Sequence, residues 1–172
     1  MADSPSLQTR SLISPLLTEH SSDQLTPLTD SALPGEGFDE VATTLEALVQ
    51  APERCQAAPF YIQAVVSQRR AFLATNLNAK REIRVTRLAT VWSVGRNLAC
   101  AIAIPHTSIS RCHAVLGYCI GQGFYITDTA SKNGTWLNQR RLEPTVRHQL
   151  RDGDLLRLGI LDVEFFVTAP SA

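Results

Sequence analysis

The stretch DTASKNGTWLN, residues 128–138, decides how the second half of this chain can fold. It follows an alternating apolar run, Gly123–Thr127, and precedes the apolar pair Trp136 and Leu137. Asn133-Gly134 between two apolar runs is a strong signal for a tight turn, because glycine adopts the positive φ that such a turn requires. The pattern alone predicts a hairpin. The turn also carries a hydroxyl, an ammonium group and a carboxamide in consecutive residues, which suggests a site for a polar ligand.

The sequence from about residue 71 to residue 168 is a series of short runs rich in Val, Ile and Leu, divided by turn residues. Many short strands with no helical pattern between them predict an all-β sandwich over residues 71–168. The predicted strands are Phe72–Leu77, Glu82–Leu88, Thr90–Arg96, Ala101–Ile104, His113–Ile120, Gly123–Thr127, Thr135–Leu137, Leu155–Leu158 and Asp162–Thr168.

The first 70 residues have a different pattern, and residues 169–172 form a short tail. Residues 1–37 are rich in Ser, Thr and Pro without an apolar period, so we predict a disordered, acidic tail. Residues 38–70 are predicted to be a helical extension. In Phe38–Gln50 the apolar residues Phe38, Val41, Leu45, Leu48 and Val49 share one helical face, and Ala51-Pro52 is expected to end that helix.

Two ambiguities remain in this extension. The helix at 38–50 either packs on its own domain or binds a partner. Residues 59–70 fit both a helix beginning at Pro59 and an alternating strand, and we favour the helix.

Charge separates the same two parts of the chain. Residues 1–57 carry two basic and nine acidic residues, a net charge of −7, whereas the remainder carries fourteen and seven, a net charge of +7. The basic part suggests an anionic partner, although two ordinary solvated surfaces would also explain the charges. No apolar run reaches the roughly 20 residues that span a bilayer. The four cysteines lack C-x-x-C or zinc-ligand spacing, which predicts reduced thiols in a cytoplasmic protein.

Enzyme signatures are absent from the sequence. There is no G-x-S-x-G elbow, phosphate-binding G-x-x-x-x-G-K-[ST] loop or H-E-x-x-H helix. Ser110, His113 and Asp128 could be assembled into a hydrolase set, but almost any sequence of this length offers one. We therefore expect no enzyme, no cofactor and no metal ion.

What stands out is a series of polar loops between the apolar strands: Gly95-Arg96, Ile109–Ala114, Ser131–Thr135 and Leu150–Gly159. Loops at one end of a sandwich meet in space. Their arginines, lysine, hydroxyls and carboxamide would make a donor-rich site for a doubly charged phosphate.

The order GR, SRxHA, DxxSxNGTxxN, LxxGDxLxxG resembles the forkhead-associated (FHA) domain, and the resemblance covers roughly residues 71–168. It implies an FHA-type sandwich of about eleven strands that binds phosphothreonine peptides. By the same resemblance, Arg96 and Ser110 hold the phosphate, Arg111 and Lys132 are supplementary donors, and Asn133 bonds the peptide backbone.

The resemblance also implies supporting positions. His113 braces the loops without touching the ligand, Gly95 and Gly134 provide backbone freedom, and Thr135 anchors its loop to the core.

Two hypotheses for function follow. The first is a phosphothreonine-dependent adaptor in Ser/Thr-kinase signalling, whose partner is a Thr-phosphorylated kinase or kinase substrate and not a nucleic acid. The second is a phosphate-independent scaffold that uses the sandwich face or the N-terminal helix. Thr43 and Thr44, beside acidic residues, are possible regulatory phosphosites that would allow the N-terminal tail to occupy the chain's own pocket.

Overall fold

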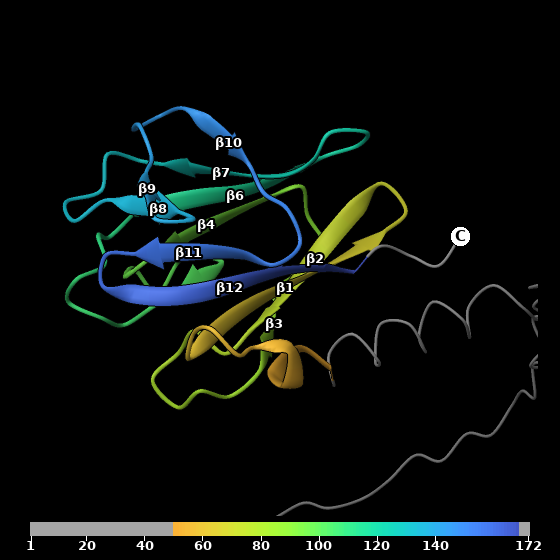
Figure 1. The fold of residues 1–172 in the computed structure, drawn as a ribbon, viewed down its shortest axis with the longest axis horizontal. Helices are drawn as coiled ribbons and strands as arrows, with labels where there is room; N and C mark the ends of the chain where they lie inside the picture. The colour runs from red at the N-terminus through yellow and green to blue at the C-terminus, as the bar shows by residue number, and fades with distance from the viewer. Residues whose placement is uncertain (1–49, 169–172) are drawn as a thin grey trace, which may run out of the picture. The chain divides into compact units, whose positions relative to one another are not determined.

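The computed structural model describes residues 50–168, which form two β-sheets packed face to face (Figure 1). The seven-stranded sheet has the order β3-β2-β1-β12-β11-β8-β9, and the five-stranded sheet has the order β10-β7-β6-β4-β5. The strands are β1 Phe60–Ser67, β2 Arg70–Thr75, β3 Arg84–Val85, β4 Val91–Gly95, β5 Ile102–Ala103, β6 Ala114–Cys119, β7 Gly123–Asp128, β8 Thr135–Leu137, β9 Arg140–Arg141, β10 Arg147–Gln149, β11 Asp154–Leu158 and β12 Leu161–Thr168.

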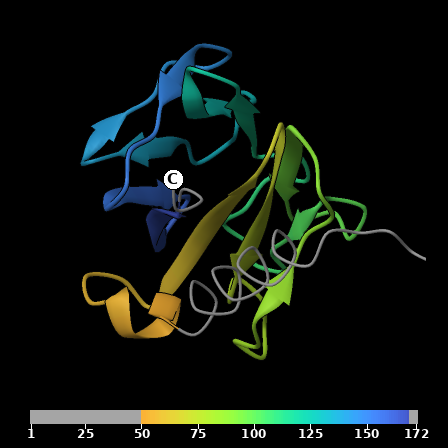
Figure 2. The same ribbon diagram turned by 90° about the vertical axis from the view of Figure 1, so that its right-hand side faces the viewer.

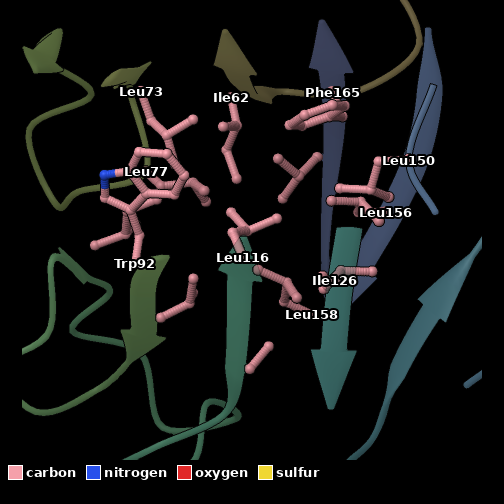
Figure 3. Close-up of a cluster of buried hydrophobic side chains, with 14 of the residues drawn as sticks. Ile62, Leu73, Leu77, Trp92, Leu116, Ile126, Leu150, Leu156, Leu158 and Phe165 are labelled. Carbon is pink, nitrogen blue, oxygen red and sulfur yellow. The ribbon is translucent and has the colours of Figure 1, made fainter. Parts of the chain in front are cut away.

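The hydrophobic core fills the space between the sheets. Figure 3 shows Ile62 and Phe165 from one sheet pointing toward Leu116 and Ile126 from the other. Phe124 of β7 meets Phe165 of β12 edge to face, with ring centroids 5.7 Å apart. Burying such side chains is the main stabilising contribution available to a sandwich. The predicted all-β sandwich is confirmed, with twelve strands where about eleven were expected.

The predicted helix over residues 59–70 is wrong, because Phe60–Ser67 is strand β1. β1 lies between β2, to which it is antiparallel, and β12, to which it is parallel. Ile62 points into the core while Tyr61 and Val65 are buried on the opposite face, so the strand is apolar on both sides. A strand buried on both faces loses the alternation by which a sequence reveals it. The sandwich therefore begins at Phe60 and not at residue 71.

The N-terminal extension is described only from residue 50. Residues 50–54 are helical, so the helix does not end at Ala51-Pro52 as predicted. The amide of Cys55 closes this turn by donating to the Ala51 carbonyl at 3.2 Å. The turn lies beside β1 in Figures 1 and 2. Ala51 belongs to a small buried cluster with Tyr61. The predicted tail at 1–37, most of the predicted helix at 38–50, and residues 169–172 lie outside the described residues.

The Asn133-Gly134 turn is not the hairpin that the sequence pattern predicted. β7 belongs to the five-stranded sheet and β8 to the seven-stranded sheet, so the loop between them crosses from one sheet to the other. Gly134 does adopt a positive φ, of 83°. The hairpin comes one strand later, between β8 and β9, where Asn138 and Gln139 have φ values of 48° and 69°. Two successive positive φ angles are the signature of a type I′ turn.

Other differences concern short elements with polar sequences. The strand predicted at 82–88 is reduced to the two residues of β3, and the predictions contained neither β9 nor β10. These three strands lie at sheet edges and expose most of their side chains, so they carry no apolar alternation.

All four cysteines are free thiols; Cys112 is exposed and the other three are partly buried. Among residues 50–168, no helix is long and apolar enough to cross a membrane.

Candidate functional site

Three loops enclose a surface pocket of about 950 Å³ at one end of the sandwich. They are the β4–β5 loop, the β5–β6 loop and the β7–β8 loop. All five residues predicted to bind ligand line this pocket, and its described lining contains no Asp or Glu. The lining residues are Ser93, Arg96, Asn97, Ala99, Cys100, Thr107, Ser108, Ile109, Ser110, Arg111, Cys112, Ala130, Lys132 and Asn133.

Arg96 enters the pocket directly from the end of β4. Its backbone amide donates to the Ser110 carbonyl at 2.9 Å, which ties the β4–β5 loop to the β5–β6 loop. Gly95 permits this contact, because a Cβ atom there would lie 2.3 Å from the Arg111 carbonyl oxygen. The Arg96 guanidinium is exposed and has no hydrogen bond or ion pair with any described residue. It is available for a bidentate contact with an anion.

Ser110 and Lys132 are connected across the pocket. The Lys132 backbone amide donates to Ser110 Oγ at 3.0 Å, so the serine hydroxyl accepts from the protein and keeps its own proton for a ligand. The Lys132 side chain is exposed and makes no ion pair within residues 50–168. Arg111, also exposed, presents its guanidinium on the same loop as Ser110. The pocket thus holds three cations and a hydroxyl donor, which suits a phosphate group.

The side-chain amide nitrogen of Asn133 holds this residue in place. Its Nδ2 donates to the Ser108 carbonyl at 2.8 Å, and no described residue donates to its Oδ1. An amide oxygen oriented in this way can accept an N–H from a ligand's backbone. Gly159 supports the arrangement from the other sheet, since a Cβ there would lie 2.7 Å from the same Ser108 oxygen. Nothing in the sequence pattern indicated this close approach of Gly159 to Ser108.

His113 joins two of the three loops from below the pocket, with no exposed surface of its own. The Ser110 amide donates to Nδ1 at 3.1 Å, and Nε2 lies 3.1 Å from the Gly134 carbonyl. This pattern fits a neutral imidazole with its proton on Nε2. Burial lowers the pKa of His113, against opposing contributions from the Gly134 carbonyl and the Asp128 carboxylate. The imidazole is therefore uncharged at neutral pH, and the role of His113 is to hold the two loops together.

Asp128 organises the β7–β8 loop from its first residue. One carboxylate oxygen accepts from Ser131 Oγ at 2.6 Å and from Thr135 Oγ1 at 2.7 Å, and the other accepts from the Ser131 amide at 3.0 Å. Burial would raise the pKa of Asp128, but these hydrogen bonds together with nearby His113 lower it below its usual value. The Ser131 hydroxyl, which the sequence interpretation counted among the loop's donors, is thus already used within the loop.

Several lining residues were not predicted, and only one had a recognisable sequence signal. Asn97 follows Arg96, and its side-chain oxygen accepts from the Ala99 amide at 3.0 Å, a turn for which asparagine is well suited. Ser93, Thr107 and Ser108 are small polar residues of a kind found on any surface, so nothing in the sequence distinguishes them. Thr43 and Thr44, the possible phosphosites, lie outside the described residues.

A two-sheet sandwich with a carboxylate-free cationic pocket on its loops belongs to the class of β-sandwich modules that can bind an anionic ligand. The FHA domain family model matches residues 92–159. An FHA domain-containing protein, PS1 of Arabidopsis thaliana, is 37% identical over 67 residues, which are 38% of this chain and 4% of that relative. The predicted resemblance to the FHA domain is thus confirmed for residues 92–159 of the chain.

Solved FHA domains are among the structures that this chain resembles. One, from a study of phosphothreonine-dependent FHA domain interactions, is 28% identical, with a TM-score of 0.42 over 49% of this chain and 82% of the other. A second is the FhaA FHA domain complexed with the intracellular domain of Rv3910. It is 31% identical, with a TM-score of 0.40 over 46% of this chain and 84% of that one. FHA domains are binding modules for phosphothreonine peptides.

Proposed function

We propose that this protein is a phosphothreonine-dependent adaptor rather than an enzyme, and that it recruits a Thr-phosphorylated kinase or kinase substrate. The observation that carries the proposal is the convergence of Arg96, Ser110, Lys132 and Asn133 on one pocket without a carboxylate. Arg96 and Ser110 hold the phosphate, with Lys132 and Arg111 as further cations. Asn133 accepts from or donates to the peptide backbone beside the phosphothreonine. The cytoplasm, where kinases act and thiols stay reduced, is the proposed compartment.

The affinity of such a site is expected to be in the micromolar range. A dissociation constant of 1 μM corresponds to about 8 kcal/mol, a value within reach of one phosphate and a few backbone hydrogen bonds. Most of the specificity for phosphate comes from Arg96, because its guanidinium has no competing partner among the described residues.

The test measures binding of a degenerate phosphothreonine peptide library and of the same library with unmodified threonine. Wild type should retain only the phosphorylated library, and Arg96→Ala should retain neither. Arg84→Ala is the matched control, because Arg84 is an equally exposed arginine on β3 that does not line the pocket. Equal retention of the phosphorylated library by wild type and Arg96→Ala would contradict the proposal.

The same reagents address the phosphate-independent scaffold hypothesis. Partners captured from lysate that survive phosphatase treatment and the Arg96→Ala substitution would favour a scaffold. Phosphorylation of Thr43 or Thr44 would, in the adaptor hypothesis, place a competing ligand on the same chain. Kinase treatment should then lower the affinity for a phosphothreonine peptide, and Thr43→Ala with Thr44→Ala should abolish that decrease.

A further inference from the structure

The outer face of the seven-stranded sheet, on the side opposite the core, is unusually apolar. The strand register aligns Val85 of β3, Ala74 of β2, Gln63 of β1 and Phe166 of β12 in one row across four strands. Val65 of β1 extends the face by a second row. An exposed sheet face would normally carry polar residues at such positions. Apolar residues at these positions instead indicate a face that another segment covers.

The two ends of the row differ in exposure. At the β12 end, Gln63 is 0%, Tyr61 2% and Phe166 4% exposed. The Tyr61 hydroxyl and Gln63 Oε1 are buried and have no hydrogen-bond partner among residues 50–168. At the β3 end, Val85 is 53% and nearby Ile83 49% exposed. The apolar face therefore continues past its covered part to an edge that is open to solvent.

The described chain begins on the covered end of this face. Ala51 and Cys55 pack against Tyr61 and Phe166. Arg54 forms an ion pair with Asp152 at 2.7 Å, and its guanidinium carbon lies 4.3 Å from the centre of the Phe166 ring.

The residues that follow are fixed to the same strand. The amides of Gln56 and Ala57 both donate to the Glu164 carboxylate of β12. Residues 51–57 are thus held over β1 and β12, and the segment that precedes them starts from that point.

The sequence of residues 38–49 complements the remainder of the face. Its apolar positions, among them Val41, Leu45 and Leu48, recur at helical spacing. Twelve helical residues span about 18 Å, and the three strands β1, β2 and β3 cover about 10 to 14 Å at the usual strand spacing. A helix entering at residue 50 has the length needed to reach the β3 edge.

Charge gives this helix a direction. Its distal end carries Asp39 and Glu40, and Lys80 and Arg87 flank β3 without an ion pair to any residue within 50–168. Opposite charges at the far end of the row favour a helix that crosses from β1 toward β3.

We propose that residues 38–49 dock as an amphipathic helix across the outer face of β1, β2 and β3, with Leu45 and Leu48 on the sheet and Asp39 and Glu40 at the basic β3 edge. The N-terminal segment then covers the outer face of its own domain. The face is occupied by this chain itself and not by a second copy or another protein.

The experiment compares two full-length variants by NMR and urea unfolding. Leu45→Asp places a charge on the docked face of the helix, and Ala47→Asp places the same charge on its opposite face. Leu45→Asp should shift the amide signals of Val65, Ala74 and Val85 and lower the folding equilibrium constant about tenfold, as expected when a leucine loses its burial. Ala47→Asp should do neither. Identical spectra and stabilities for the two variants would overturn the proposal.

A charge exchange tests the direction of the helix. Arg87→Glu should weaken docking, measured by the same amide signals, and Glu40→Lys in the same chain should restore it. Failure of the second substitution to restore the signals would overturn the proposed orientation. Concentration-dependent shifts at Val85, with a dimer in sedimentation, would identify a second copy as the occupant and overturn the proposal as well.

Discussion

Acidification below pH 6.5 should destabilise the protein, because the fold buries His113 as a neutral imidazole. His113 is fully buried and holds the Ser110 amide and the Gly134 carbonyl, each at 3.1 Å. Burial lowers its pKa in the folded state, whereas the unfolded chain retains a value near 6.5. Below pH 6.5 the unfolded chain therefore binds a proton that the folded chain does not bind, and the free energy of unfolding falls as pH falls.

The magnitude follows from this difference in proton binding. Above pH 6.5 the contribution is fully present. Below pH 6.5, one such group lowers the free energy of unfolding by at most about 1.4 kcal/mol per pH unit, until the pH reaches the folded-state pKa. Asp128, whose pKa is lowered, contributes in the same direction but only as pH falls below about 4, near the ordinary value of an aspartate. The window between pH 6.5 and pH 5 thus isolates the histidine from this carboxylate.

Urea unfolding of wild type and His113→Gln at pH 7.5, 6.5 and 5.5 provides the assay. Glutamine has an amide donor and an oxygen acceptor for the two loop contacts but does not titrate. Wild type should lose stability from pH 6.5 to pH 5.5, and His113→Gln should start lower but lose less stability over that interval. Trp92, which is buried in the core, supplies the fluorescence signal. Parallel losses in the two proteins would show that His113 does not remain neutral in the fold, and would refute the reasoning.

Three further predictions concern the loops around the pocket. Asp128→Asn should lower the free energy of unfolding by about 3 kcal/mol in thermal or urea unfolding, because an amide nitrogen cannot accept from the donors that now bond the carboxylate. Gly95→Ala should unfold at a lower urea concentration than wild type, because its new methyl group would lie 2.3 Å from the Arg111 backbone oxygen; unchanged stability would mean that the loops can separate freely. Lys132→Ala should leave stability unchanged and weaken phosphothreonine-peptide binding about tenfold or less by calorimetry, since the lysine is exposed and its backbone amide, which bonds Ser110, is retained.

The sequence was most informative where a residue acts locally. Polar loops between apolar strands were sufficient to predict the sandwich, and the family pattern placed Arg96, Ser110 and Asn133 on loops that do meet at one pocket. Gly134 adopts the positive φ expected of a turn glycine. The strand and turn predictions depend on neighbours a few residues away, which a sequence displays directly, whereas the meeting of the three loops was implied by the family resemblance.

The sequence did not predict features that depend on strand pairing between residues far apart in the chain. β1 is a strand because β12, about a hundred residues later, lies parallel to it, and periodicity within residues 60–67 cannot reveal that pairing. The supposed hairpin at Asn133-Gly134 is a crossing between sheets for the same kind of reason: β8 pairs with β11 and not with β7. Turn residues report the local backbone, but they do not report which strand the chain joins next.

The loop at 128–138 divides into two sets of residues with separate tasks. Asp128, Ser131 and Thr135 are buried and bond to one another, which fixes the loop against the core. Lys132 and Asn133 lie between them, exposed, and line the pocket.

Because the two sets share no side-chain hydrogen bond, their effects should separate. Substitutions of Lys132 and Asn133 should change affinity at nearly constant stability, whereas substitutions of the buried set should change stability first. A Thr135→Val variant tests the buried set: it keeps the shape of the side chain, removes one donor to Asp128, and should cost about 1 to 2 kcal/mol of unfolding free energy. If its peptide affinity fell by more than its stability explained, the division of the loop into a support and a ligand surface would be wrong.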